Sequence, residues 1–494
     1  MKTIFLAIPH YIFTSDLLRT KYIEYLSSKY RVIVLTPMID GETAKSGNYF
    51  QSPNVIYIKH ASERPSFWNK MKFFRLACVN EFDYLASMRH YYQRPIYKND
   101  TKRRWLHFLA KPFFWLLTAR FFSEVEQSLL PQSRTFAALV KEFQPALLVT
   151  ATPGFDPWEA ELILYARRFK LPSYDDSSAL SVRGLPSYDD SSALSVRGLP
   201  SYDDSSALSV RGLPTVAANF SWDNLTMNCK HIRKTDYLIP WNEVMKEEAM
   251  TIHGYPKERL FVSGTPRFDP YFDKTVKPLS REEFLRSKGL NPKYKTIFHT
   301  TVTKAYPFQK KYIHDLLQLR DNGSIPYMNI FVRLHPLDEP KNYEEFKDIK
   351  DFAIENAGAA IQTERGARVE MSYADLLNLR YSLAYTDINI NYASTISIEA
   401  CIFDKPVVNI GWIDHYKLAY DFNHYKPIVD SGAVKVAKTD YDLPKLINLY
   451  AADPTIDSEN RKKIVERYVG FTDGLSYKRS VDFLDKIIQT NTNG

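Results

Sequence analysis

Runs of apolar and β-branched residues alternate with helix-patterned segments along most of this chain of 494 residues. The first three segments are TIFLAI, LLRTKYIEYLSSKY and RVIVLTP, where an apolar run gives way to a period of about 3.6 residues and then to a β-branched run. Strands that alternate with helices indicate parallel sheets, because a parallel pair of strands needs a crossover connection. The pattern therefore predicts an α/β fold of doubly wound, Rossmann-like sheets.

The alternation forms two series, which predict two lobes that face each other across a cleft. The first series ends with DYLIPWN, EVMKEEAMTIHG and RLFVSG, which we expect to form a strand, a helix and a strand. The second series begins at the strand KTIFHTT, after a charged stretch that contains prolines. The length also favours two domains, since a single hydrophobic core stops growing below this size. We predict a first lobe over 1–275, a second over 276–472, and a final helix and tail over 473–494 that returns to the first lobe.

A tandem repeat interrupts the first series. The 14 residues LPSYDDSSALSVRG occur three times without a mismatch, at 171–184, 185–198 and 199–212. Their Ser, Asp, Gly and Pro content, with few large apolar residues, cannot bury a core of its own. We predict that 171–212 is a solvent-exposed insertion between a helix and a strand, and a partner-binding segment is the alternative.

Cysteine usage and charge exclude several classes of protein. Cys78, Cys229 and Cys401 lie far apart without paired spacing, which argues against disulfides and zinc and favours the reducing cytoplasm. No metal site and no cofactor are expected. The net charge of +8 is local, because residues 1–130 hold 19 Lys and Arg against 10 Asp and Glu. No nucleic-acid-binding signature accompanies this basic region, so nucleic acid is not expected as a partner.

The most hydrophobic stretch is KRRWLHFLAKPFFWLLTARFF, at residues 102–122. Charged residues and Pro112 interrupt it, so we do not expect a spanning helix. Apolar residues flanked by basic ones suggest an interfacial segment that contacts anionic lipid. This interpretation predicts a cytoplasmic protein held peripherally on the inner face of the plasma membrane. A core helix of the first lobe is the alternative.

The segment NYASTISIEACIFDKPVV predicts an anion site where a strand turns into a helix. Ser394 and Thr395 would stand at the helix N-terminus, where hydroxyls and free N–H groups suit a diphosphate. Glu399 follows one turn later and could accept hydrogen bonds from ribose hydroxyls. An ordinary helix cap is the alternative.

Two further strand ends carry polar residues suited to a donor. In FVRLHP, Arg333 and His335 project to the same side of a strand, where both can meet negative charge. In KTIFHTTVTK, Thr300 and Thr301 lie at a neighbouring strand end and could reach phosphate or acceptor. Ligands bind at the carboxyl ends of strands in such sheets, so we expect these residues to share one site.

Three loops of the first lobe offer a general base for an acceptor hydroxyl. Asp223 follows a strand in NFSWDNLT, Asp156 lies in ATPGFDPWEAE, and His10 lies with Asp16 after the first strand. Asx turns and helix caps are the structural alternatives for these carboxylates.

Five segments in this order resemble the GT-B glycosyltransferase group, and within it the CDP-glycerol glycerophosphotransferase-like enzymes of cell-surface polymer synthesis. The resemblance covers mainly residues 215–480. Its pieces are SWDNLT, WNEVMKEEAMTIHGYPKERLFVSGTPRFDP, RLHP, STISIEACIFDKPVV and VGFTDGLSYKRSVDFL. It implies a GT-B fold, metal-independent transfer, and a donor nucleotide in the second lobe at Arg333, His335, Ser394, Thr395 and Glu399. The glycerophosphotransferases have a catalytic His in a WHGT motif, whereas this chain has Trp222-Asp223-Asn224, which favours an Asp base and a sugar donor.

These observations predict a glycosyltransferase that moves a sugar from a nucleotide-activated donor to a surface polysaccharide or lipid-linked acceptor, with inversion. Alternatives are a nucleotide-sugar 2-epimerase, a CDP-glycerol-type glycerophosphotransferase and a non-catalytic, membrane-associated glycan-binding protein. We expect His335→Ala or Glu399→Ala to abolish transfer without unfolding the protein.

Overall fold

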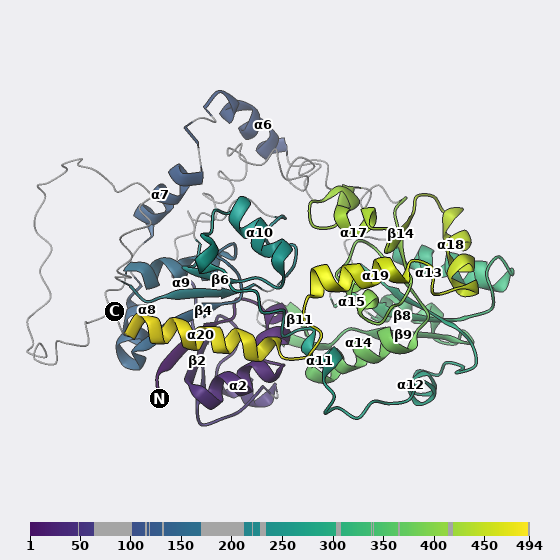
Figure 1. The fold of residues 1–494 in the computed structure, drawn as a ribbon, viewed down its shortest axis with the longest axis horizontal. Helices are drawn as coiled ribbons and strands as arrows, with labels where there is room; N and C mark the ends of the chain where they lie inside the picture. Colours follow the sequence, from purple (N-terminus) through teal and green to yellow (C-terminus); the bar gives the residue numbers. More distant parts are fainter. Residues whose placement is uncertain are drawn as a thin grey trace, which may run out of the picture.

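Two parallel sheets of six strands each form the framework of the protein (Figure 1). The structure is a computed structural model of the whole chain. It describes residues 1–47, 49–63, 101–113, 116–117, 119–130, 133–168, 212–219, 221–227, 234–302, 308–336, 338, 340–363, 366–412 and 418–492. The predicted insertion at 171–212 lies outside these residues except for Gly212, as do Cys78 and Cys229.

The first sheet has the strand order β3-β2-β1-β4-β5-β6. Its strands are β1 (Thr3–Ala7), β2 (Arg31–Thr36), β3 (Val55–Lys59), β4 (Pro145–Thr150), β5 (Thr215–Ala218) and β6 (Tyr237–Ile239). The helices of this part are α1 (Thr14–Leu17), α2 (Lys21–Lys29), α3 (Gly41–Ser46), α8 (Arg134–Phe143), α9 (Pro157–Arg168) and α10 (Glu243–Thr251). β1 is buried along its whole length, as a central strand covered on both faces should be. The order reverses between β1 and β4, so their carboxyl ends flank a topological switch point.

The second sheet has the order β14-β13-β12-β7-β8-β9. Its strands are β7 (Thr296–Thr300), β8 (Asn329–Leu334), β9 (Phe352–Asn356), β12 (Ile388–Asn391), β13 (Val407–Ile410) and β14 (Val434–Ala437). Its helices are α13 (Gln309–Asp321), α14 (Tyr373–Tyr385), α15 (Ile396–Ile402), α17 (Lys426–Asp430), α18 (Asp442–Ala452) and α19 (Ser458–Ile464). Here the order reverses between β7 and β12, which places a second switch point beside the ends of these strands.

The C-terminal helix α20 (Ser476–Thr492) lies against the first sheet and α2 (Figure 1). Its buried apolar face joins the hydrophobic core of that sheet through Val481, Leu484, Ile487 and Ile488. Ion pairs hold its outer edge, where Lys29 Nζ lies 2.7 Å from Asp482 Oδ1. The helix thus belongs to the first core although it follows the second sheet in the chain.

Some elements differ from the sequence prediction. RLFVSG forms a single bridge between Leu238 and Leu260 rather than a strand, because the backbone turns soon afterwards at Gly264, with φ of 81°. The strand β9 and the antiparallel hairpin of β10 (Ala359–Thr363) and β11 (Gly366–Glu370) were not predicted. β11 contacts the 3-10 turn Tyr11–Phe13 of the first lobe. Within the charged linker, α11 (Asp269–Phe272) and α12 (Arg281–Ser287) form two short helices.

The hydrophobic stretch at 102–122 is split into α6 (Thr101–Ala110), a 3-10 turn and α7 (Ala119–Leu129). The helix ends just before Pro112, which lacks a backbone N–H donor. Trp105 is 67% exposed and Phe108 68%, so the alternative of a core helix is wrong for α6. Among the described residues, no helix is long and apolar enough to cross a membrane.

Candidate functional site

The predicted donor residues gather at the switch point of the second sheet. Thr300 ends β7 and pairs in register with Arg333 of β8. The next residues are also joined, because the backbone N–H of His335 donates to Thr301 Oγ1 at 2.8 Å. Ser394 and Thr395 follow β12, the other strand at this switch point. The structure therefore brings together at one sheet edge the side chains that the sequence placed there.

The turn from β12 into α15 is unusually tight. Ala393 has a φ of 38°, a left-handed conformation that is uncommon for a residue with a side chain. Thr395 then occupies the N-cap position without a capping bond from its side chain. Ser394 and Thr395 are both partly exposed. Strain of this kind concentrates at functional sites, which agrees with a role for this turn in ligand binding.

Arg333 and His335 differ in how much of each side chain is accessible. Arg333 is 4% exposed and pairs with Glu355, but its buried Nη2 has no hydrogen-bond partner within the described part of the chain. His335 is partly exposed, and burial lowers the pKa of its imidazole. A neutral imidazole and an arginine with a free donor can both bind phosphate oxygens.

Glu399 is fully buried, at 0% exposure. Its Oε2 accepts a hydrogen bond of 2.6 Å from the hydroxyl of Tyr271, and its Oε1 lies 3.7 Å from Arg267 Nε. Tyr271 also lies close enough to Arg333 for the two to interact electrostatically. A role for Glu399 in ribose binding stays a prediction, but its present partners come from the protein. Glu399→Ala should therefore destabilise the protein, because two polar groups would lose their partner, and the expectation that the variant stays folded remains a prediction.

Arg267 and Tyr271 are the residues of this site that the sequence did not identify. Arg267 lies in the GTPRFDP segment, which precedes the second sheet, and Tyr271 directly follows this segment in α11. Arg267 also interacts electrostatically with Asp16 of α1, so it lies between a carboxylate of each lobe. A single Arg in a connecting segment has no sequence periodicity around it, so the sequence pattern could not indicate that Arg267 lies at this site. The family resemblance of GTPRFDP was the only available signal.

Asp16 is the candidate base that faces a cavity. Its side chain is 3% exposed, and it lines a cavity of about 10 Å³ between α1, the end of β5 and the start of the GTPRFDP segment, the space of roughly one water molecule. Ser15 Oγ donates to its Oδ1 at 2.9 Å. Burial raises its pKa to about 6, which the charge of Arg267 partly offsets.

The other candidate bases have structural partners. Asp156 accepts hydrogen bonds from the backbone N–H groups of Trp158 and Glu159, at 2.9 and 3.2 Å, and so caps α9. Asp223 is partly exposed and accepts a hydrogen bond from Ser221 within a turn. His10 is partly exposed at the end of β1. Catalysis by Asp156, Asp223 or His10 stays a prediction.

The first sheet offers less to an anion at its own switch point. After β4, the backbone N–H groups of Ala151 and Thr152 donate to the carboxylate of Glu159, at 2.6 and 3.0 Å. A carboxylate of the protein thus occupies donors that could otherwise bind phosphate. This asymmetry favours the second sheet as the place for a phosphorylated donor.

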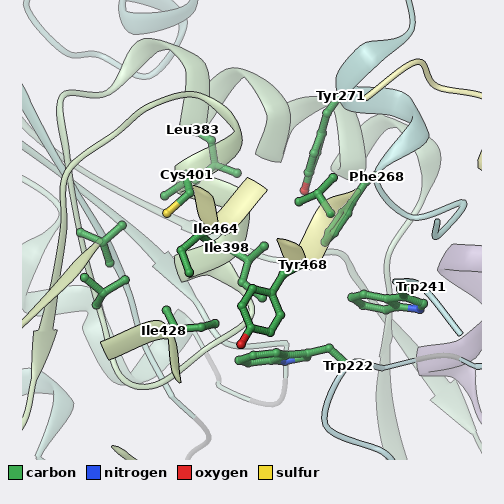
Figure 2. Packing of buried hydrophobic residues seen from close by; sticks show 14 of the residues in the cluster. Trp222, Trp241, Phe268, Tyr271, Leu383, Ile398, Cys401, Ile428, Ile464 and Tyr468 are labelled. Carbon is green, nitrogen blue, oxygen red and sulfur yellow. The ribbon is translucent and has the colours of Figure 1, made fainter. Parts of the chain in front are cut away.

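An aromatic contact joins the SWDNLT turn to the second lobe. Trp222 is 5% exposed, and its ring centroid lies 4.8 Å from that of His424 and 6.3 Å from that of Tyr468. Figure 2 shows Trp222 directly against Tyr468 within a cluster that also holds Ile398 of α15. A hydrogen bond of 2.9 Å between Thr226 Oγ1 and His424 Nδ1 accompanies this contact. Trp222 thus anchors the lobes to each other.

A family model agrees with the order of motifs in the second half of the chain. The model described as CDP-Glycerol:Poly(glycerophosphate) glycerophosphotransferase matches residues 215–486, which is more than half of the chain. No curated protein sequence matches.

Solved structures share the two-lobed architecture. A putative UDP-N-acetylglucosamine 2-epimerase from Listeria monocytogenes is 10% identical, with 99% of this chain and 98% of that chain covered and a TM-score of 0.51. MnaA of S. aureus, in a structure with UDP, is 12% identical, with 99% and 97% covered and a TM-score of 0.50. The wall teichoic acid polymerase TagF, in a structure with CDPG, is 12% identical, with 100% and 90% covered and a TM-score of 0.49. Identities this low concern the fold alone, and the two six-stranded parallel sheets together with the first two of these structures confirm the predicted GT-B fold.

Proposed function

Because this chain belongs to the CDP-glycerol:poly(glycerophosphate) glycerophosphotransferase family, we propose that it transfers a group from a nucleotide-activated donor to a growing cell-surface polymer. The family makes the chain a transferase at this coarse level. The transferred group and the acceptor are our proposal. The observation that carries it is the convergence of Thr301, Arg333, His335, Ser394 and Thr395 at the switch point of the second sheet.

We propose a sugar as the transferred group. The glycerophosphotransferases have a catalytic His in WHGT, and this chain has Asp223 and Asn224 after Trp222 instead. A catalytic base that differs from that of the glycerophosphotransferases is consistent with the transfer of a different group. The acceptor would be a glycan or a lipid-linked glycan bound by the lobe before residue 275, and the donor would bind the lobe over 276–472.

The proposed reaction is a single displacement with inversion. An acceptor hydroxyl loses its proton to a carboxylate of the first lobe and attacks the anomeric carbon of the donor. The bond to the diphosphate breaks, and the diphosphate leaves with the electron pair. Arg333, His335 and the turn at Ser394 would stabilise the charge that develops on it, which requires no metal in this scheme.

Nucleotide binding tests this function. We expect at least one of UDP, GDP, CDP and their sugar or glycerol conjugates to raise the midpoint of thermal unfolding. At a ligand concentration a hundred times the dissociation constant, the free energy of unfolding should rise by about 2.7 kcal/mol. The double variant Ser394→Ala, Thr395→Ala should lose most of this gain, whereas Ser324→Ala, exposed on a turn far from this edge, should keep it.

Two outcomes would contradict the proposal. If no nucleotide changed the midpoint, a glycan-binding protein without catalysis would be favoured. If UDP-N-acetylglucosamine were epimerised without any acceptor, the protein would be an epimerase.

We also propose that α6 and α7 bring the enzyme to an anionic membrane surface. Figure 1 shows both helices at the periphery of the first lobe. Large apolar side chains are exposed there, and Lys102 and Arg104 lie on the same helix as Trp105 and Phe108. Apolar groups beside basic ones suit the boundary between acyl chains and anionic head groups. The acceptor would then be lipid-linked.

Charged substitutions on α6 should abolish this contact. We expect Trp105→Glu with Phe108→Glu to lower co-sedimentation with phosphatidylglycerol vesicles at least tenfold, because burying each aromatic ring contributes about 1.5–3 kcal/mol. Tyr441→Glu is the matched control, since Tyr441 is exposed on the second lobe. Equal co-sedimentation of the double variant and the wild type would contradict membrane binding through α6.

A further inference from the structure

Four charged side chains between the lobes each have a buried polar atom without a hydrogen-bond partner among the described residues. These atoms are Asp16 Oδ2, Arg267 Nε, Glu399 Oε1 and Arg333 Nη2. Electrostatic interactions link Asp16 with Arg267 and Glu399, and link Tyr271 with Glu399, Arg267 and Arg333. The four side chains therefore form one group, which we call the junction cluster.

The junction cluster is assembled from three separate parts of the chain. Asp16 comes from α1, Arg267 from the GTPRFDP segment before the second sheet, and Glu399 from α15. Arg267 and Glu399 are the charged groups that face Asp16. The cavity beside Asp16 is otherwise lined by neutral side chains, among them Asn219, Ser263 and Thr265.

Charged groups with an atom that lacks a hydrogen bond are costly to bury. Buried polar atoms nearly always have partners, and those that lack one in a native fold need an explanation. The ion pair between Arg267 and Glu399 spans 3.7 Å, which is longer than a charge-assisted hydrogen bond. Asp16 Oδ2 and Arg267 Nε, which have no hydrogen-bond partner among the described residues, are complementary to a hydroxyl and a phosphate oxygen, respectively.

We propose that Asp16 takes the proton of the attacking acceptor hydroxyl and that Arg267 holds the donor phosphate oxygen that gains charge. This inference rests on the transferase function proposed above. The acceptor O–H bond breaks, and its proton goes to Asp16 Oδ2. The acceptor oxygen bonds to the transferred group, whose bond to a phosphate oxygen of the nucleotide breaks. That oxygen keeps the electron pair and is stabilised by Arg267.

The roles of Asp16 and Arg267 are the same for either class of donor. In sugar transfer the bond that breaks joins the anomeric carbon to a diphosphate oxygen, and in glycerophosphate transfer it joins the glycerol-bearing phosphorus to the bridging oxygen, which leaves with CMP. Both reactions require a hydroxyl to lose its proton. The cavity has the space of about one hydroxyl group beside Asp16.

A pH dependence follows from the position of Asp16. Its raised pKa of about 6 means that the base is protonated, and inactive, below this pH. The rate should therefore rise as the pH increases through about 6. A carboxylate with only a structural role would not make the rate rise with pH in this way.

The test uses the full chain with Asp16→Asn and Arg267→Lys. Release of UDP from UDP-N-acetylglucosamine, or of CMP from CDP-glycerol, is measured from pH 5 to 8 with envelope membranes as acceptor. We expect Asp16→Asn to lower kcat at least a hundredfold and to change the dissociation constant of the nucleotide by less than about threefold. The rate of this variant should no longer rise as the pH increases through about 6. Arg267→Lys should weaken binding and kcat together, because Lys lacks the fork of donors.

The matched controls are Asp40→Asn and Arg286→Lys. Asp40 caps α3, and Arg286 is exposed on α12, so both variants should have the wild-type rate and nucleotide binding. If Asp16→Asn kept the wild-type rate and pH profile, the assignment of the base would be overturned. If the wild type bound no nucleotide, the transferase function itself would fail. If Arg267→Lys bound and turned over donor normally, its contact with phosphate would be overturned.

Discussion

Replacement of Glu399 by alanine is expected to lower the free energy of unfolding by about 3–5 kcal/mol and to remove turnover. The carboxylate is fully buried and accepts the hydroxyl hydrogen of Tyr271. Its removal would leave that hydroxyl and Arg267 without their partner and would open a cavity beside them. Urea denaturation measures the loss of stability, and donor turnover measures the loss of function.

Glu399→Gln separates these two effects. Glutamine keeps the volume and a carbonyl oxygen that can accept from Tyr271, but it removes the negative charge facing Arg267. We expect a smaller loss of stability than for Glu399→Ala, with turnover still strongly reduced. An unchanged unfolding midpoint for Glu399→Ala would contradict the buried position described above.

Replacement of Trp222 by alanine should lower the free energy of unfolding by about 3–5 kcal/mol, because Trp222 has a large buried side chain at the contact between the lobes. Its ring packs edge-on against His424 and Tyr425, at centroid distances of 4.8 and 5.7 Å. The loss should also loosen the lobes, so small-angle scattering should show a larger radius of gyration.

Trp105→Ala is the control for Trp222→Ala. Trp105 is 67% exposed, so its removal should change stability by no more than about 0.5 kcal/mol. Equal effects of the two substitutions would show that Trp222 does not anchor the lobes.

Periodicity predicted most of the framework because strands and helices are local features. The runs KTIFHTT, NIFVRLHP and DININYAS became β7, β8 and β12, and the polar residues at their ends share one sheet edge. The rule that ligands bind at the carboxyl ends of parallel strands made this edge predictable. The GT-B fold and the family followed from five motifs in order.

The sequence could not predict contacts between distant segments. More than a hundred residues separate Asp16 from Arg267 and Arg267 from Glu399, and only the folded chain brings the three together. For the same reason Glu399 looked like an open ribose ligand, although Tyr271 and Arg267 enclose it. The hairpin of β10 and β11 escaped notice because it lies outside the alternation of strands and helices.

A crystal structure with bound UDP or CDP would show where the donor binds. We expect the diphosphate at the carboxyl edge of the second sheet, in contact with the turn at Ser394 and Thr395 and with Arg333 or His335. A diphosphate bound by the first sheet, or one that lies away from this turn, would contradict this expectation.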